Sequence, residues 1–182
     1  MLPLTRRAAL ALPFLAALPA LAENSATDTV VLKTKHGDVV IRLLPDIAPK
    51  HVKQIQALVA RHFYDGIVFH RVIPGFMAQT GDPTGTGAGG SDLPNLPLEA
   101  STTPFTRGTV GMARAQDPDS ANSQFFICTA DTPSLNGSYT VFGEVVSGME
   151  FVDKIKAGTQ ANNGAVKNPD KIVSMRFAPD AK

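Results

Sequence analysis

Two short β-forming runs, 67–72 and 76–80, lie on either side of Pro74-Gly75. Proline presets one turn dihedral and glycine permits the other, so this segment predicts a tight antiparallel hairpin. Pairing that is symmetric about the turn places Arg71 opposite Gln79, with Cβ atoms roughly 5 Å apart. A glutamine at that distance can hold a guanidinium in one orientation. Taken alone, the hairpin favours an exposed strand arginine in a surface ion pair.

The remainder of the chain carries many strand signals and few helix signals. Further strands are predicted at 30–35, 39–44, 109–113, 124–129, 139–146 and 171–177. Pro49 opens one helix, whose apolar stripe comprises Val52, Ile55, Val59 and Phe63. A capping box at 147–150 predicts a second helix that continues through Ile155 and stops at Gly158. This pattern predicts a mainly β protein, a closed barrel with helical caps.

The first 22 residues differ from the rest and predict a secretory signal peptide, which leaves 23–182 as one domain. Arg6-Arg7 is followed by an apolar run and by a small-residue ending at Ala20-Leu21-Ala22. The run is too short for a membrane span, so no membrane association is expected after cleavage. We expect a periplasmic or secreted protein. The twin-arginine and Sec export routes both fit these residues.

Charge and cysteine content exclude several classes of partner and cofactor. Loss of the two leader arginines leaves 15 basic and 16 acidic residues, a net charge of −1. This charge gives no electrostatic reason to expect nucleic acid or an anionic membrane as partner. Cys128 is the only cysteine, so no disulfide can form within the chain. The four histidines are scattered without metal-ligand spacing, and we expect no metal and no cofactor.

Two further features have a structural interpretation. The segment 85–90 matches the dinucleotide-binding pattern G-x-G-x-x-G, but such a site needs a helix directly after the glycines. The proline-containing stretch 91–97 cannot supply that helix, so we predict a flexible loop. Strand alternation points His70 away from the face of Arg71. We therefore expect a hydrogen-bonded structural histidine there and not a catalytic base.

Four ordered segments resemble the cyclophilin family of peptidyl-prolyl isomerases. They are Phe69-His-Arg with Gly75-Phe-Met and Gln79, then 111–115, 122–128 and 135–143. The resemblance covers about residues 28–178. It implies an eight-stranded antiparallel barrel with a helix over each open end, a Gly-rich loop bordering the substrate groove, and activity on proline-containing peptides and unfolded protein clients. We expect a monomer.

The resemblance also implies roles for individual residues. Arg71 takes the position of the catalytic arginine, and Gln79 that of the residue that orients it. The proline-pocket positions fall on Phe76, Met77, Phe126 and Leu135. The groove for the peptide backbone is lined by Ala113, Arg114, Ala115 and Gln124, and Tyr139 stands at a substrate-binding position.

Three positions depart from many eukaryotic members of that family. Arg114 stands in place of an asparagine, Ser134 in place of a tryptophan, and Tyr139 in place of a histidine. Exported bacterial cyclophilins often vary at these positions, so activity is still expected. The family's cyclosporin site uses the tryptophan indole as a donor, and its replacement by Ser134 predicts weak cyclosporin binding.

Two alternatives to an isomerase remain at this level. A non-catalytic proline-binding or chaperone module would use the same groove without turnover, although Arg71, Phe76 and Phe126 together favour the enzyme. A lipocalin-like barrel would carry a small ligand inside. Large apolar side chains on both faces of the strand at Phe125 and Phe126 instead predict a filled interior.

Overall fold

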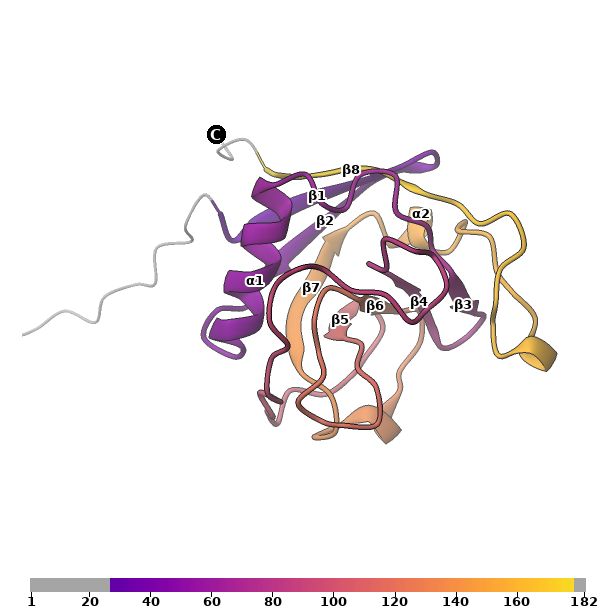
Figure 1. Cartoon of the computed structure of the whole chain (residues 1–182). Coiled ribbons are helices and arrows are strands. Elements are labelled where there is room, and N and C mark those ends of the chain that lie inside the picture. Colours follow the sequence, from indigo (N-terminus) through magenta and orange to yellow (C-terminus); the bar gives the residue numbers. More distant parts are fainter. Residues whose placement is uncertain (1–26, 179–182) are drawn as a thin grey trace, which may run out of the picture.

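The computed structural model describes residues 27–178 (Figure 1), and the predicted signal peptide lies outside the described residues. Eight strands form one antiparallel sheet in the order β3-β4-β6-β5-β7-β2-β1-β8. Their bounds are β1 Thr29–Thr34, β2 Gly37–Leu43, β3 Arg71–Ile73, β4 Met77–Thr80, β5 Thr109–Met112, β6 Phe125–Cys128, β7 Val141–Ser147 and β8 Ile172–Phe177. The helices are α1 Pro49–Ala60 and α2 Met149–Val152, with 3-10 turns η1 Pro133–Leu135 and η2 Gln160–Asn162. Within 27–178, no helix has the length and apolar character needed to cross a membrane.

The sheet curls but does not close into a barrel, so the predicted closure is wrong. Within the described residues the edge strands β3 and β8 form no ladder with each other. Isolated bridges at Val68–Lys171 and Arg71–Ala165, together with backbone hydrogen bonds such as that from the Phe69 N–H to the Asp170 carbonyl, connect the two edges of the sheet. The segment before β8 contains Asn168 in a left-handed conformation, with φ of 53°, followed by Pro169. Proline has no N–H to donate to a ladder, and the left-handed residue turns the chain out of the strand direction.

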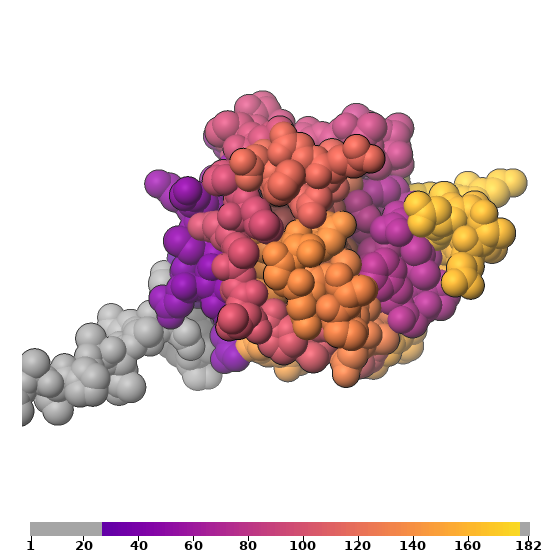
Figure 2. Space-filling model, turned by 90° about the horizontal axis from the view of Figure 1, so that it is seen from below, coloured from indigo at the N-terminus to yellow at the C-terminus, as the bar shows by residue number. Residues whose placement is uncertain are grey.

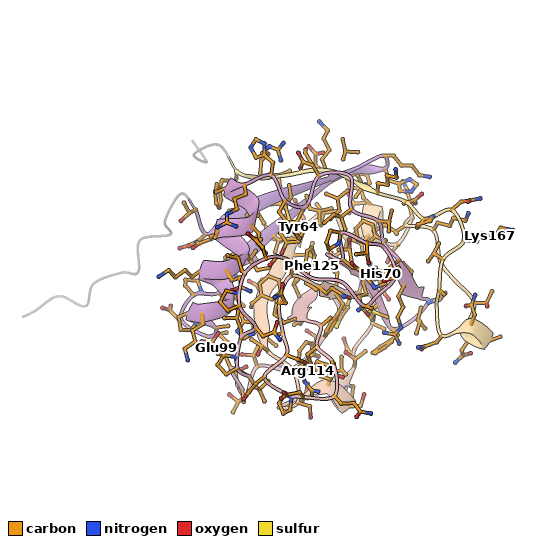
Figure 3. The ribbon with its side chains drawn as sticks, viewed as in Figure 1. Tyr64, His70, Glu99, Arg114, Phe125 and Lys167 are labelled. Atoms are coloured by element: carbon orange, nitrogen blue, oxygen red, sulfur yellow. The ribbon has the colours of Figure 1, made fainter. Side chains whose placement is uncertain are left out.

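The concave side of the curled sheet is filled by side chains. Phe125 on β6 is fully buried there, and its ring meets Tyr64 edge-on with centroids 5.4 Å apart (Figure 3). Phe126 points to the opposite face and joins a second, smaller cluster with Met77, Phe105, Cys128 and Val141. Buried residues from β1, β2, α1, β5, β7 and β8 complete the main core. The filled interior argues against a lipocalin-like ligand cavity.

Helix α1 confirms most of the predicted apolar stripe. Pro49 stands in its first turn, and Val52, Ile55 and Val59 are buried, whereas Phe63 lies beyond the helix end. The N-cap residue makes no side-chain hydrogen bond. Instead, Glu99 from a distant loop accepts the N–H groups of the second and third helical residues, at 3.1 and 3.0 Å. Tertiary contact therefore caps this helix.

Helix α2 is shorter than predicted, and the predicted capping box does not form. The helix has four residues and ends at Val152, short of Ile155. Ser147 is the last residue of β7, where it pairs with Val40 of β2, so it cannot serve as a cap. Gly148 occupies the N-cap position with φ of 93°, and a Cβ there would lie 2.4 Å from the carbonyl oxygen of Asp38. Close approach of β2 therefore decides where this helix begins.

Asp170, just before β8, connects the β1–β2 turn to the segment after α2. Its carboxylate is 6% exposed and accepts hydrogen bonds from Lys35 Nζ at 2.7 Å, the Lys156 N–H at 3.0 Å and His36 Nε2 at 3.1 Å. Burial alone would raise the pKa of this carboxyl, but these hydrogen bonds outweigh it and lower the pKa to about 2. A carboxyl whose pKa is depressed on folding stabilises the fold above its unfolded pKa, and this is lost as the pH falls through about 2.

We therefore expect Asp170→Asn to lower the free energy of unfolding by about 2 kcal/mol at pH 7. The difference from the wild type should shrink as the pH falls below about 4. Asp170 then takes up a proton when the wild-type chain unfolds, and this proton uptake favours the unfolded state. Urea unfolding at several pH values measures this. A difference that is equally large at pH 2.5 and pH 7 would contradict the electrostatic explanation.

Candidate active site

The hairpin β3–β4 has the predicted register. Arg71 pairs with Gln79 across the strands, and Arg71 Nη1 donates to Gln79 Oε1 at 3.2 Å. The same nitrogen lies 3.9 Å from Met77 Sδ, and the guanidinium carbon lies 6.0 Å from the centre of the Phe76 ring. A cation is therefore held against an aromatic ring and a thioether.

Asn163 also orients Arg71, and the sequence analysis missed it. Arg71 Nε donates to the Asn163 carbonyl oxygen and Nη2 donates to Asn163 Oδ1, both at 3.0 Å. The loop that carries Asn163 (yellow in Figure 2) lies beside the β3–β4 hairpin. Asn163 follows η2 in a left-handed conformation, with φ of 55°. The Asn162-Asn163-Gly164 turn signal was available, but a separation of 92 residues gives no sequence link to Arg71.

The guanidinium keeps one donor for a substrate. Arginine has five N–H groups, and four are accounted for by Asn163, by Gln79 and by the weak contact with Met77 sulfur. The remaining N–H, on Nη2, has no recorded partner among the described residues. Burial lowers the pKa of Arg71, partly offset by Tyr139. A reference pKa above about 12 still keeps the group charged at neutral pH.

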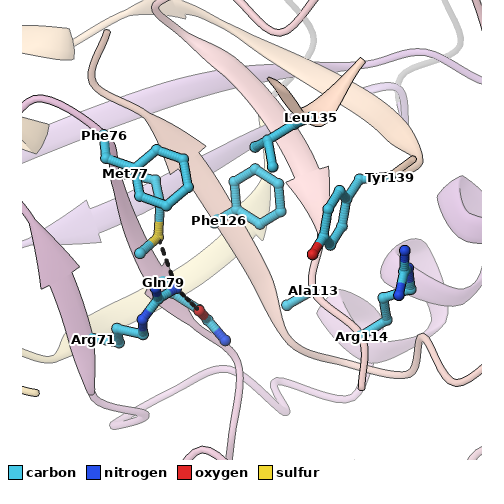
Figure 4. Close-up of a pocket in the computed structure, with 9 residues that line it drawn as sticks. All are labelled: Arg71, Phe76, Met77, Gln79, Ala113, Arg114, Phe126, Leu135 and Tyr139. Atoms are coloured by element: carbon cyan, nitrogen blue, oxygen red, sulfur yellow. Dashed lines mark hydrogen bonds between the residues drawn. The ribbon is translucent and has the colours of Figure 1, made fainter. Parts of the chain in front are cut away.

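Nine of the eleven predicted site residues line one pocket of about 100 Å³ (Figure 4). These nine are Arg71, Phe76, Met77, Gln79, Ala113, Arg114, Phe126, Leu135 and Tyr139. Phe126 is 5% exposed and lies between Phe105, stacked at 5.7 Å, and Tyr139, edge-on at 5.9 Å. Two packed neighbours fix its ring, so the apolar part of the pocket is preformed.

Arg114 packs along the rim instead of pointing at Arg71. Its guanidinium carbon lies 4.6 Å from the centre of the Tyr139 ring. Its Nη2 and Nε donate to the Ser138 carbonyl oxygen at 3.0 and 3.3 Å. The two arginines stand at opposite ends of the row of side chains in Figure 4. Of these two arginines, Arg71 is therefore the one that stands at the apolar end of the pocket.

The other two predicted residues, Ala115 and Gln124, line an adjoining groove of about 570 Å³. One wall of this groove is the Gly-rich loop 87–91, and the opposite wall is 113–115. No helix follows the glycines, which confirms that the dinucleotide pattern is coincidental. The groove shares Gln79, Ala113 and Arg114 with the smaller pocket, so an extended chain has a continuous path along both.

His70 is buried at 9% exposure and lines neither pocket. The predicted hydrogen bond is absent, because neither ring nitrogen has a partner among the described residues. Instead the ring packs beneath the Gly-rich loop, where a Cβ on Gly87 would lie 3.5 Å from it. Burial lowers the pKa of His70, which Asp82 partly opposes. The ring is therefore neutral at neutral pH.

Residues 27–178 contain no group of three His, Cys, Asp or Glu side chains that could hold a metal ion. Cys128 is a buried free cysteine, and burial raises the pKa of its thiol. A thiol that is both buried and protonated is a poor nucleophile.

Comparison with known proteins agrees with this geometry. The family model for cyclophilin type peptidyl-prolyl cis-trans isomerases matches residues 29–177. A probable peptidyl-prolyl cis-trans isomerase of Brucella suis is 59% identical over 166 residues, which is 85% of each chain. A peptidyl-prolyl cis-trans isomerase-like 1 protein of Aspergillus fumigatus is 39% identical over 155 residues, covering 83% of this chain and 94% of that protein.

Solved structures show the same similarity. A Hirschia baltica cyclophilin superposes with a TM-score of 0.76 at 27% identity, covering 87% of this chain and 76% of that one. A Cryptosporidium parvum cyclophilin type isomerase, crystallised in the presence of the dipeptide Ala-Pro, also has a TM-score of 0.76, at 30% identity. That match covers 84% of this chain and 99% of the other. Sequence, fold and pocket thus agree: the chain belongs to the cyclophilin family of peptidyl-prolyl cis-trans isomerases.

Proposed function

We propose that this isomerase acts on X-Pro bonds of exported, unfolded protein clients, with Arg71 as the catalytic residue. The observation that carries the proposal is the guanidinium of Arg71. It is held by Gln79 and Asn163 at the edge of an apolar pocket, with one N–H left over. A permanently charged donor fixed in this way suits a reaction that creates a new hydrogen-bond acceptor and moves no proton.

Rotation about an X-Pro bond creates such an acceptor. The barrier is roughly 18–20 kcal/mol because twisting breaks amide conjugation, and the uncatalysed reaction takes tens to hundreds of seconds. In the twisted state the prolyl nitrogen regains its lone pair, which it lacks in the planar amide. A donor aimed at that nitrogen binds the transition state more tightly than the ground state, which is the requirement for catalysis.

One hydrogen bond does not account for an efficient enzyme. A charge-assisted hydrogen bond contributes roughly 1.5–3 kcal/mol, or about one to two decades in rate. Excluding water strengthens the interaction, since the local dielectric falls. Phe76, Met77, Phe126 and Leu135 supply that exclusion and would hold the proline ring while the preceding carbonyl swings. Gln79 acts by orienting Arg71.

The adjoining groove supports the choice of substrate. An extended peptide seated along 113–115 can meet backbone groups there, while its proline enters the smaller pocket. The C. parvum relative was crystallised in the presence of a dipeptide that contains proline. We also propose that the protein is a monomer, which gel filtration of the mature protein tests.

The deciding experiment is a protease-coupled assay with an X-Pro peptide. Mature protein should accelerate the slow phase in proportion to its concentration. A non-catalytic chaperone module would bind the peptide without changing that phase, and this result would overturn the proposal. Fractionation of cells that carry the full-length chain tests the exported location. An accumulation of unprocessed protein in the cytoplasm would refute that part.

The reaction should show almost no dependence on pH. Arg71 stays charged throughout, and His70 is buried, lines neither pocket and has a lowered pKa. We expect kcat/KM to be nearly constant from roughly pH 6 to 9 with a peptide that has no ionisable group in that window.

The control for the pH profile is a folded His70→Gln variant. A step near pH 6.5 in the wild type that disappears in this variant would show that His70 takes part in the reaction. The purely electrostatic mechanism would then be wrong.

A further inference from the structure

Asp82 is an almost fully buried carboxylate that lines neither pocket, with 1% of its surface exposed. It accepts the Thr84 N–H and the Thr84 hydroxyl, both at 2.8 Å, and the Gly87 N–H at 2.6 Å. The Thr86 hydroxyl lies 3.5 Å away. These donors lie in residues 84–87, which lead into the Gly-rich loop 87–91. The loop backbone therefore wraps around the Asp82 carboxylate.

The loop in turn holds Gln124. Gln124 Nε2 donates to the carbonyl oxygens of Gly87 at 3.0 Å and of Gly89 at 2.8 Å. Both hydrogens of this amide thus have backbone acceptors on the loop. These two acceptors determine the orientation of the Gln124 amide, because a flipped amide would place its own oxygen against the two backbone carbonyl oxygens.

The direction of the Gln124 amide determines the direction of the next one. Gln124 Oε1 accepts from Gln79 Nε2 at 3.0 Å, so Gln79 presents Oε1 to Arg71 Nη1 at 3.2 Å. If Gln124 flipped, Gln79 would have to present its NH₂ group to a guanidinium, donor against donor. The chain of hydrogen bonds from the loop to Arg71 therefore has only one workable polarity.

We propose that Asp82 is a positioning residue for isomerisation: by shaping the Gly-rich loop it sets the direction of both glutamine amides and so holds Arg71 in its catalytic orientation. This inference rests on the proposed role of Arg71. Hydrogen bonds from the Thr84 hydroxyl and from backbone N–H groups overcome the effect of burial, and they lower the pKa of Asp82 to about 2. The carboxylate is thus an anion throughout the working range of the enzyme.

Asp82→Asn tests the inference with almost no change in size. An asparagine has one acceptor oxygen and an NH₂ group, so it cannot face the same set of donors without setting donor against donor. We expect kcat to fall roughly tenfold, equivalent to about 1.4 kcal/mol, with KM changing much less. Asn163 still holds the guanidinium from its other side, which keeps the loss below that expected for removing Arg71.

Asp170→Asn is the matched control. Asp170 is also buried, also has a pKa of about 2, and also accepts a backbone N–H, but its carboxylate bonds Lys35, His36 and Lys156 and not the Gly-rich loop. Both variants should unfold at lower urea concentration. Only Asp82→Asn should lose kcat when measured on folded protein. Equal kcat values for the two variants would reduce Asp82 to a structural role and overturn the inference.

A second readout does not depend on activity. Hydrogen exchange of the Gln124 side-chain amide, followed by NMR, should be slow in the wild type and in Asp170→Asn, and at least about tenfold faster in Asp82→Asn. Thr84→Val removes one hydroxyl donor outside the pocket and should give a smaller acceleration. This milder variant keeps the test available if Asp82→Asn does not fold.

The outcomes separate the two proposals. If hydrogen exchange of the Gln124 side-chain amide is unchanged in the folded variants, the positioning role of Asp82 is refuted, even if the enzyme is active. An inactive wild type whose Gln124 exchange responds to Asp82 would refute the isomerase proposal and leave the hydrogen-bond chain standing.

Discussion

Arg71→Ala is expected to lower kcat/KM by roughly 10²–10³, the usual loss for a donor that acts on the transition state. The side chain is partly exposed at the pocket edge and belongs to neither core cluster, so the fold should persist. The protease-coupled assay measures the effect, and circular dichroism checks the fold. KM should change little, since the planar amide offers Arg71 no acceptor at nitrogen.

Arg71→Lys separates charge from geometry. Lysine keeps the positive charge but cannot reproduce the three-sided fixation by Gln79 Oε1 and the two oxygens of Asn163. We expect a loss only slightly smaller than that of the alanine variant. Near-normal activity in folded Arg71→Ala protein would contradict the mechanism. Full activity in Arg71→Lys would show that charge without orientation is sufficient.

Ser134→Trp is expected to tighten cyclosporin inhibition by roughly 5- to 150-fold, from a weak starting value. Ser134 is exposed on η1, directly before the pocket residue Leu135. The family resemblance implies that a tryptophan here donates its indole N–H to the drug. An indole also adds a large apolar face, and the two terms together contribute roughly 1–3 kcal/mol. Inhibition curves in the peptide assay measure the change.

Ser134→Leu is the matched control for that prediction. Leucine supplies apolar surface without an N–H donor, so it should recover only part of the gain. Peptide turnover should change little in both variants, because Ser134 is not among the residues that line either pocket. Tight inhibition of the unmodified protein would refute the prediction.

Much of the pocket follows from local sequence. The Pro74-Gly75 turn alone predicts that Arg71 faces Gln79, and the structure confirms this pairing. Strand alternation likewise predicts that Phe125 and Phe126 lie on opposite faces of β6, which places them in separate clusters. Such features depend on backbone dihedral preferences and on the alternation of side chains between the two faces of a strand, and both are local properties of the chain.

Other parts of the structure depend on distant segments. Asn163 reaches Arg71 only because the segment after η2 runs beside β3, where Val72 N–H donates to the Gly164 carbonyl. The start of α2 is determined by the approach of β2 to Gly148. His70 lies next to Gly87 of the Gly-rich loop, which is 17 positions further along the chain. A sequence pattern that spans a few residues cannot predict these contacts between distant segments.

The sequence by itself therefore determined the strands, the first helix, the hairpin register and the residue types of the pocket, because turn chemistry and side-chain periodicity act over a few residues. Tertiary structure alone decided that the sheet stays open between β3 and β8, that Glu99 caps α1, and that Asn163 and the Asp82 loop converge on Arg71. The physical reason is that hydrogen bonds between distant segments depend on where the curled sheet brings those segments, and the curl accumulates from the twist of all its strands.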